Sequence, residues 1–511
     1  MYRNPLLFLF SVQINDGKII LVILAVFREQ DGYSEMTRPN PKPKSQTNRK
    51  TVVVAGASGF VGRDLIERLR TQYRVVGLTR SPARKDQDGI EWRNCDLFSV
   101  LQTENALRGA DYAVYLVHSM SPAARLSQGS FADIDLLLAD NFARAARHNR
   151  VKQILYIGGL IPEGPELSEH LKSRLEVEHA LAATGVPVTT FRAGLILGAG
   201  GSSFQMMVRL VDRLPIMICP AWTRSLSCPV ELAVVVDAIQ RAMGTRSFYR
   251  RSIDLAGPEV ISYVNLMRLT AGALGKRRFM LTVPLFAPWL SLLWIRIFSG
   301  QSMSLIRPLV QSLRHDMLPR AGHTFSRRGR PLSAVLEEAA RIEPRSPTGR
   351  GAPPANKKRR NNVCSVQRLP LPAGSDALEV AVDYAGWLPR FLRPLLDVQR
   401  HPPGRILVRL RFLETPLLEL TYAPERSTAG RALYYITGGW LRAKSIDGPP
   451  GRLEFRECPN HRHLLSIVLD FEPALPWPVY LITQAPAHLF VMRAFGRHLG
   501  RAGRQTGPSV L

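Results

Sequence analysis

Residues 51–62, TVVVAGASGFVG, constrain the fold of this chain more than any other segment. A valine-rich run typical of a buried strand leads directly into three glycines at intervals of three residues, and the amphipathic segment DLIERLR follows. In such a turn, one glycine permits the tight bend, another lets backbone N–H groups approach a pyrophosphate, and the third lets the helix pack close to the strand. The segment therefore predicts a dinucleotide-binding unit made of Gly56, Ala57, Ser58, Gly59, Phe60, Val61 and Gly62.

The next predicted strand, YRVVGLTR, ends in a basic residue about 20 positions beyond Gly59. At this place a carboxylate would bind the ribose 2′-hydroxyl of NAD, whereas a basic residue accommodates the additional phosphate of NADP. Arg80 therefore favours NADP as the cofactor, with NAD as the alternative. An ordinary solvated basic loop would give the same pattern.

The following segments alternate between strand and helix patterns. IEWRNCDL, YAVYLV and KQILYIGG read as strands separated by helices, which gives at least four β–α units. This alternation predicts an α/β fold with a doubly wound parallel sheet of the Rossmann type. Asp96 and Leu97 close the first of these strands, where an adenine ring would lie, and Val117 closes the second. We add these three residues to the predicted cofactor site.

Several motifs in this region resemble the atypical, extended short-chain dehydrogenase/reductase (SDR) superfamily. They are GASGFVG, the basic end of the second strand, CDL, LVHSM, and TTFRAGLILG with the later PVELAVVVDAI. Within that superfamily the chain most resembles bacterial NAD(P)H-binding proteins related to the nucleotide-binding accessory subunit of respiratory complex I. The resemblance covers roughly residues 50–320 and implies an NAD(P)-dependent oxidoreductase.

The residues that carry catalysis in that superfamily are replaced here. The resemblance implies a serine after the fifth strand and a Tyr-x-x-x-Lys pair on the next helix, but this chain has Gly158 and Gly159, and then His170 and Arg174. In one interpretation, His170 is a substitute proton donor near neutral pH and Arg174 holds the ribose or a phosphate. In the other, His170 is a polar helix residue and the site binds nucleotide without turnover.

Composition divides the rest of the chain into further parts. We expect an N-terminal extension over residues 1–50, the nucleotide-binding domain with a substrate-capping region over 51–318, a basic disordered linker over 319–368, and a second domain over 369–505. The two apolar runs of the extension are shorter than the roughly 18 residues that a membrane span needs. Either they belong to a signal-like segment, or residues 1–35 lie outside the working protein and translation starts at Met36.

The second domain shows the period-two pattern of antiparallel strands. In GRILVRLRF, for example, Ile406, Val408 and Leu410 share one face and arginines share the other. A long helix, PAHLFVMRAFGRHL, follows the last strand pattern. This order is similar to the helix-grip fold of the START-like superfamily, and that resemblance implies a cavity between sheet and helix for a small apolar ligand.

Net charge limits the classes of partner that the chain suits, and cysteine content limits its compartment. The formal charge of +27 favours anionic partners, but no aromatic residues interleave the basic linker to stack on bases, so we expect no nucleic-acid binding. The apolar segment Leu281–Gly300 is either a buried helix or a peripheral membrane contact. Five cysteines without a CxxC pair indicate a reducing, cytoplasmic setting, and the scattered histidines predict no metal site.

These features together predict an NADP(H)-binding oxidoreductase that acts on an apolar carbonyl or quinone-like substrate. The alternative is a non-catalytic dinucleotide sensor or assembly factor. Loss of the serine, tyrosine and lysine favours the alternative, whereas a second, cavity-forming domain favours the enzyme.

Overall fold

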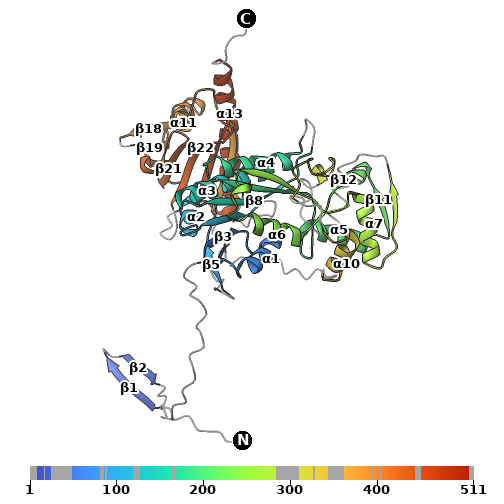
Figure 1. Cartoon of the computed structure of the whole chain (residues 1–511). Helices are drawn as coiled ribbons and strands as arrows, with labels where there is room; N and C mark the ends of the chain where they lie inside the picture. Colours follow the sequence, from blue (N-terminus) through green and yellow to red (C-terminus); the bar gives the residue numbers. More distant parts are fainter. Residues whose placement is uncertain are drawn as a thin grey trace. The chain divides into compact units, whose positions relative to one another are not determined.

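The computed structural model (Figure 1) describes residues 9–15, 18–24, 49–80, 86, 89–118, 127–162, 167–283, 310–325, 329–342, 362–393, 395–402, 404–443 and 450–505. The chain divides into two units, Met1–Asn48 and Arg49–Leu511. The first unit contains an antiparallel hairpin of β1 (Leu9–Asn15) and β2 (Lys18–Leu24). The two apolar runs of the N-terminal extension thus contribute one strand each.

A seven-stranded parallel sheet forms the centre of the second unit. Its order is β14-β9-β8-β6-β3-β4-β5, and every neighbouring pair is parallel. The chain runs outward from β3 to β5 and then returns to the other side of β3, so the strand order reverses between β3 and β6. This confirms the predicted doubly wound fold. The strands are β3 (Thr51–Ala55), β4 (Arg74–Thr79), β5 (Ile90–Asn94), β6 (Tyr112–Tyr115), β8 (Gln153–Gly159), β9 (Val188–Ala193) and β14 (Arg251–Leu255).

Helices cover both faces of this sheet, which explains the near-continuous apolar runs of its strands. Val52 and Val54 point into a core shared with α1 (Phe60–Leu69) and α6 (Leu232–Ala242). Val53 points into the opposite core, which is formed with α2 (Val100–Ala106), α3 (Phe131–His148) and α4 (Glu169–Ala182). The two helical layers are seen on either side of the sheet in Figure 1.

A smaller subregion extends the first domain beyond the sheet. Its core contains Met207 of α5 (Ser202–Arg213), Met267 of α7 (Tyr263–Ala273) and Leu336 of α10 (Leu332–Ile342). α10 lies within the expected linker but packs into this core, so part of that segment is structured. Residues 284–300, most of the apolar segment expected to contact a membrane or form a helix, lie outside the described residues. Three short strand pairs complete the subregion: β10 (Ile196–Leu197) with β13 (Val230–Glu231), β11 (Ile216–Cys219) with β16 (Phe279–Thr282), and β12 (Leu226–Ser227) with β15 (Ile261–Ser262).

The second domain contains seven strands that pair antiparallel in the order β18-β19-β20-β21-β22-β23-β17. The first of them in the chain, β17, begins at Val363, which is earlier than the expected boundary at 369. The strands are β17 (Val363–Pro370), β18 (Leu396–His401), β19 (Arg405–Leu410), β20 (Pro416–Tyr422), β21 (Arg431–Gly438), β22 (Gly451–Glu457) and β23 (His463–Phe471). The helices are α11 (Ala377–Phe391), α12 (Trp477–Ile482) and α13 (Gln484–Gln505).

Part of this second sheet is buried on both faces. Leu464 and Phe471 face a core formed with α11 and α13, whereas Leu465 and Ile467 of the same strand belong to the core that contains α3. In addition, β7 (Ser127–Gln128), which comes from the first domain, pairs in parallel with β17 and closes that edge of the sheet. The two domains therefore share a hydrophobic core and a strand pairing.

Ion pairs reinforce this shared interface. Arg368 of β17 bonds to Asp133 at 2.7 Å and to Glu176 at 2.7 Å. Arg456 of β22 bonds to Asp140 of α3 at 2.7 Å, and it also pairs with Glu454. Arg456 and Glu454 are buried, so each charge depends on its partners for compensation.

Candidate functional site

The glycine turn after β3 has the geometry that its sequence predicts. Gly56 has φ +85°, a conformation that favours glycine. The Gly59 N–H donates to the Gly56 carbonyl oxygen at 2.9 Å and closes the turn. A Cβ on residue 62 would overlap that same carbonyl oxygen and would lie 2.8 Å from Ala57 Cα. Gly62 therefore allows α1 to approach the turn closely, as a phosphate-binding turn requires.

The N-terminus of α1 has no side-chain cap. α2, α3 and α4 each begin at a serine whose hydroxyl accepts a bond from a first-turn N–H group. α1 begins at Gly59 instead, with no cap and no acidic residue in its first turn. Its first N–H groups thus have no intrahelical acceptor, and the helix dipole favours an anion there. The backbone of this turn fits the pyrophosphate of a dinucleotide.

The loop at residues 198–201 covers one side of this turn. A Cβ on Gly198 or on Gly201 would lie 3.0 Å from the Phe60 ring, so the ring packs against bare backbone. The Arg63 guanidinium lies beside Gly200, which has φ +92°. The sequence patterns indicated neither this loop nor Arg63 as part of the cofactor site. Both are now additional candidates for the cofactor site.

The other predicted cofactor residues lie along the same edge of the sheet. Arg80 follows β4 directly and is exposed. The Cys95 N–H donates to the Thr79 carbonyl oxygen at 2.8 Å, which places the turn with Asp96 next to the end of β4. The Asp96 carboxylate accepts a bond from the Phe98 N–H at 3.2 Å. Leu97 and Val117 pack against the core at this edge, so the structure brings the predicted set together.

The second domain reaches the turn formed by residues 96–99. Arg452 of β22 donates to the Phe98 carbonyl oxygen at 2.8 Å. Asn141 of α3 donates to the Leu97 carbonyl oxygen at 2.8 Å, and its own side-chain oxygen accepts from Arg456 at 2.6 Å. The place expected for the adenine ring is thus hydrogen-bonded, directly and through Asn141, to the second domain. Nothing in the sequence patterns indicated this connection.

The positions that replace the catalytic serine have a packing role. A Cβ on Gly159 would lie 3.3 Å from Leu171 and 3.7 Å from the Arg174 side chain. A Cβ on Gly158 would lie 3.2 Å from the Tyr156 ring. Glycine at these two positions therefore leaves room for the side chains of β8 and α4.

His170 lies in an environment that keeps its imidazole neutral. It is in the first turn of α4, and its Nδ1 is 3.1 Å from the Ser312 hydroxyl, which is also 3.0 Å from Ser168. Burial and the positive charge of Arg174 lower the pKa of His170 to about 3. A neutral imidazole at pH 7 does not suit the role of proton donor that the sequence suggested for it.

Arg174 is committed to a buried ion pair with Asp135 of α3. The Tyr156 hydroxyl donates to the Arg174 carbonyl oxygen at 3.3 Å, and burial raises the pKa of Tyr156 to about 12. Burial and the charge of Arg174 also lower the pKa of His118, which follows β6. Within the described residues, the Tyr115 hydroxyl and Arg174 Nε are buried without a hydrogen-bond partner.

These contacts define a polar cluster of Tyr115, His118, Asp135, Tyr156, His170 and Arg174 at the carboxyl ends of β6 and β8. Sequence reasoning named His170 and Arg174 but missed His118 and Asp135. A signal for Asp135 was available, because an aspartate in the apolar helix segment DIDLLLAD is unusual unless it is paired.

One hollow of the second domain, of about 360 Å³, lies beside α11, where Val382, Arg400, Ile406, Tyr422 and Tyr434 are among its lining residues. Rings that include Tyr384, Trp387 and Phe495 fill the core between α11, α13 and the sheet. The volume of the hollow falls within the range typical of small-molecule sites.

The described residues contain neither a metal-binding cluster nor a membrane-spanning helix. No group of three or more His, Cys, Asp and Glu side chains there is placed to hold a metal ion. In the same part of the chain, no helix has the length and apolar character needed to cross a membrane.

Comparison with known proteins agrees with the site geometry. Residues 56–206 match a protein-family model described as NAD(P)H-binding. The auxiliary protein GraX of Staphylococcus aureus is 33% identical over 141 residues, which are 27% of this chain and 42% of that relative. The match thus spans less than half of the relative.

Solved structures also resemble the first domain. A nucleoside-diphosphate-sugar epimerase from Staphylococcus aureus is 13% identical with a TM-score of 0.46, over 56% of this chain and all of that one. Triphenylmethane reductase from Citrobacter sp., solved with NADP(H), is 16% identical with a TM-score of 0.45, over 57% and 99%. An NADPH-dependent quinone oxidoreductase from Escherichia coli, solved with NADPH, is 19% identical with a TM-score of 0.42, over 57% and 95%. These likenesses say nothing about the substrate of this chain.

The first domain has a doubly wound fold of the Rossmann type, and residues 56–206, which include its glycine turn, match a family model described as NAD(P)H-binding. The second domain, an antiparallel sheet with three helices, lies outside the residues that the family model matches.

Proposed function

We propose that this protein binds NADPH along the carboxyl edge of the first sheet. The observation that carries the proposal is the uncapped N-terminus of α1 above the Gly56–Gly62 turn, where a Cβ on residue 62 would not fit. The turn would hold the pyrophosphate, and Asp96 and Leu97 would lie beside the adenine. The exposed Arg80 would contact the additional phosphate and so favour NADPH over NADH.

Fluorescence titration with NADPH and NADH tests this proposal. The wild-type protein should bind NADPH more tightly than NADH, and Arg80→Asp should weaken NADPH binding about tenfold or more while sparing NADH. Arg108→Asp, an exposed arginine after α2, is the matched control and should change neither affinity. Wild-type preference for NADH, or equal loss in both variants, would contradict the role of Arg80.

For the reaction, we propose a quinone-like acceptor rather than a simple ketone or aldehyde. The bound dinucleotide would supply the hydride. Reduction of a simple carbonyl produces a strongly basic alkoxide that needs a proton donor in place. The two candidates named from the sequence do not suit that task, because His170 is neutral and Arg174 is paired with Asp135. A quinone accepts hydride to give a conjugated, weakly basic oxygen that water can protonate.

Turnover assays distinguish these acceptors. With NADPH present, a water-soluble benzoquinone should be reduced in proportion to enzyme concentration, whereas a panel of aliphatic aldehydes and ketones should not be. His170→Asn should keep most of the quinone activity. Faster reduction of aldehydes than of quinones would overturn this assignment.

The contacts between the domains favour a second candidate, a dinucleotide sensor. Arg452, and Arg456 through Asn141, connect the second domain to the turn where adenine would lie. Occupancy of the nucleotide site would then alter the second domain without any turnover. Tight NADPH binding with no oxidation by any acceptor would favour this function over the enzyme.

For the second domain, we propose a small apolar ligand in the hollow beside α11. Aliphatic and aromatic side chains line most of it, and Arg400 and His401 supply polar groups at one side. We also place the protein in a reducing compartment such as the cytoplasm, because its five cysteines are buried and form no disulfide.

A further inference from the structure

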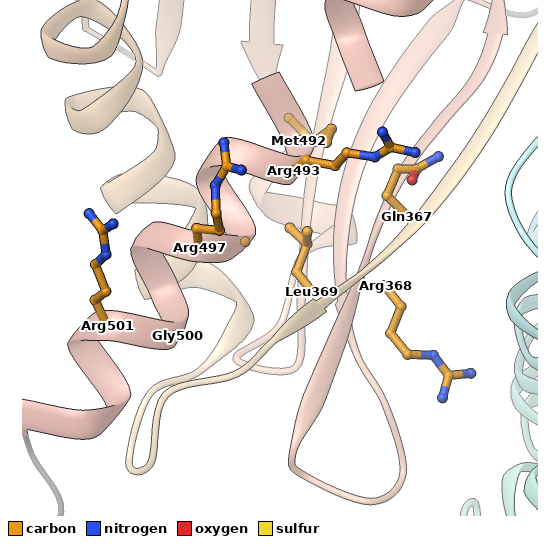
Figure 2. A pocket seen from close by; sticks show the side chains of 9 residues that line it. Gln367, Arg368, Leu369, Met492, Arg493, Arg497, Gly500 and Arg501 are labelled. Carbon is orange, nitrogen blue, oxygen red and sulfur yellow. The ribbon is translucent and has the colours of Figure 1, made fainter. Parts of the chain in front are cut away.

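The last helix, α13, carries a repeated pattern that neither the fold nor the dinucleotide site uses. The segment RAFGRHLGRAG places arginine at 493, 497 and 501, with glycine directly before the last two. Residues four apart lie on the same side of a helix, about 6 Å apart along its axis. Figure 2 shows Arg497 and Arg501 extending from α13 in nearly the same direction and Arg493 extending toward Gln367.

These arginines border a hollow of about 590 Å³ between α13 and β17. Leu369 and Met492 contribute apolar surface to it, and Gly496 and Gly500 face β17, with a Cβ on Gly496 only 3.2 Å from Leu369. The two glycines thus let the strand approach the helix and keep the hollow open beside the arginines. No acidic residue lines it.

The three side chains have no partner within the described part of the chain: Arg493, Arg497 and Arg501 are exposed and make no hydrogen bond or ion pair there. Other arginines of this domain do have carboxylate partners, namely Arg368, Arg405, Arg409, Arg431, Arg452 and Arg456. Arg368 also lines the hollow, but its side chain points away from the other three toward Asp133 and Glu176 (Figure 2).

This arrangement costs stability in the absence of a ligand. Like charges four residues apart on a helix repel each other, and each glycine in a helix interior lowers the stability of the helix relative to alanine. Close packing against β17 accounts for Gly496, but folding gives no reason for the three arginines. An anion in the hollow would remove the repulsion and would explain both the arginines and the space between them.

We propose that this hollow binds a ligand that carries two or more phosphate groups. Arginine is the side chain best suited to bidentate phosphate contacts, and three guanidinium groups one helical turn apart match a ligand with several phosphates better than a single small anion. A soluble polyphosphorylated molecule and a phosphorylated lipid headgroup both present such phosphates, and the recognising chemistry is the same for the two. The site is separate from the dinucleotide site and does not depend on it.

Calorimetric titration with inositol hexakisphosphate tests the soluble source, with NADPH present at saturation so that the first domain's anion site is occupied. The wild-type protein should bind this probe, and the affinity should fall with rising salt. The triple variant Arg493→Gln, Arg497→Gln, Arg501→Gln should lose about tenfold or more in affinity. Because it removes like-charge repulsion, it should unfold at the same or a higher temperature than wild type.

The control triple variant Arg108→Gln, Arg393→Gln, Arg411→Gln removes the same charge from exposed arginines elsewhere and should keep the affinity within about twofold. For the lipid source, phosphatidylcholine vesicles with and without phosphatidylinositol bisphosphate are co-sedimented with each protein. Loss of binding in the first triple variant alone, to either probe, supports the proposal. No wild-type binding to either probe, or equal losses in the two triple variants, overturns it.

Discussion

At the scale of single residues, the dinucleotide turn depends on the absence of a side chain at position 62. The Gly56 carbonyl oxygen and Ala57 Cα occupy the space that a Cβ would need, and both are backbone atoms of the turn itself. Neither can move without distorting the segment that would hold the pyrophosphate. Both the phosphate site and the close packing of α1 therefore require glycine at position 62.

We therefore expect Gly62→Ala to cost about 2 to 3 kcal/mol of unfolding free energy, because overpacked positions cost this much, and to abolish NADPH binding. Gly272→Ala in α7 is the matched control, because nothing lies within 4 Å of the added Cβ. It should be neutral or stabilise the protein by up to about 1 kcal/mol. Urea unfolding and NADPH fluorescence titration measure both effects. A Gly62→Ala protein with wild-type affinity would contradict the proposed turn.

His170 makes the stability of the protein depend on pH. In the unfolded chain its imidazole takes up a proton near its ordinary pKa of 6.5, whereas in the folded protein burial and Arg174 hold the pKa at about 3. The unfolded state thus binds more protons between these values, and stability falls as the pH falls through this window. The slope from this one group is about 1.4 kcal/mol per pH unit.

His170→Asn should therefore lose less stability than the wild type between pH 6.5 and pH 4. Guanidinium unfolding at several pH values measures the difference. His148→Asn, at the exposed end of α3, serves as the control and should follow the wild-type curve. Parallel curves for wild type and His170→Asn would show that the folded protein protonates His170 normally.

At the scale of elements, the sequence predicts those strands and helices that a local pattern of apolar residues marks. The valine-rich run before Gly56 is long enough and apolar enough to identify a strand buried on both faces, and β3 is an interior strand between β6 and β4. Alternation in residues 405–412 likewise identifies β19. Periodicity does not show which strands pair with one another, however. β7 has only two residues and is a strand because β17, far along the chain, pairs with it.

The same limit applies to the second domain and the polar cluster. The segment of β23 alternates as a half-buried strand does, but its second face is covered by the helical layer that contains α3, which lies elsewhere in the sequence. One interpretation of the sequence gives Arg174 the ribose or a phosphate, because its buried partner, Asp135, lies on another helix that the local pattern does not reveal. Tertiary contacts decide such roles, and one sequence does not contain them.

β7 offers an element-scale prediction. A Cβ on Gly129, the residue after β7, would lie 2.5 Å from the Val366 carbonyl oxygen of β17. Gly129→Ala should therefore push β7 away from β17 and leave this edge of the sheet unpaired. Hydrogen exchange should become faster in β17 but not in β19, which lies at the far side of the sheet. Unchanged protection of β17 would show that the pairing tolerates the methyl group.

At the scale of the whole molecule, the two domains meet at two groups of ion pairs with different neighbours. Arg456 bonds to Asp140 and to Asn141, and Asn141 bonds to the Leu97 carbonyl oxygen at the predicted adenine position. Arg368 bonds to Asp133 and Glu176 and has no hydrogen bond to residues 96–99 among the described contacts. Both arginines join the domains, but only Arg456 connects the interface to the nucleotide site.

Substitutions of these two arginines can therefore distinguish coupling between the second domain and the nucleotide site from a simple loss of stability. Arg456→Met leaves Glu454 and Asp140 buried with fewer partners, so it should cost about 3 to 5 kcal/mol, and it should also weaken NADPH binding because Asn141 loses the contact that orients it. Arg368→Met should lower stability by a smaller amount, since Arg368 and Glu176 are partly exposed, and should leave NADPH affinity unchanged. NADPH titrations well below the unfolding temperature measure the affinities of the two variants. Hydrogen exchange confirms that both domains are folded in each variant. Equal affinities in the two variants would show that the second domain does not sense the nucleotide site through Arg456.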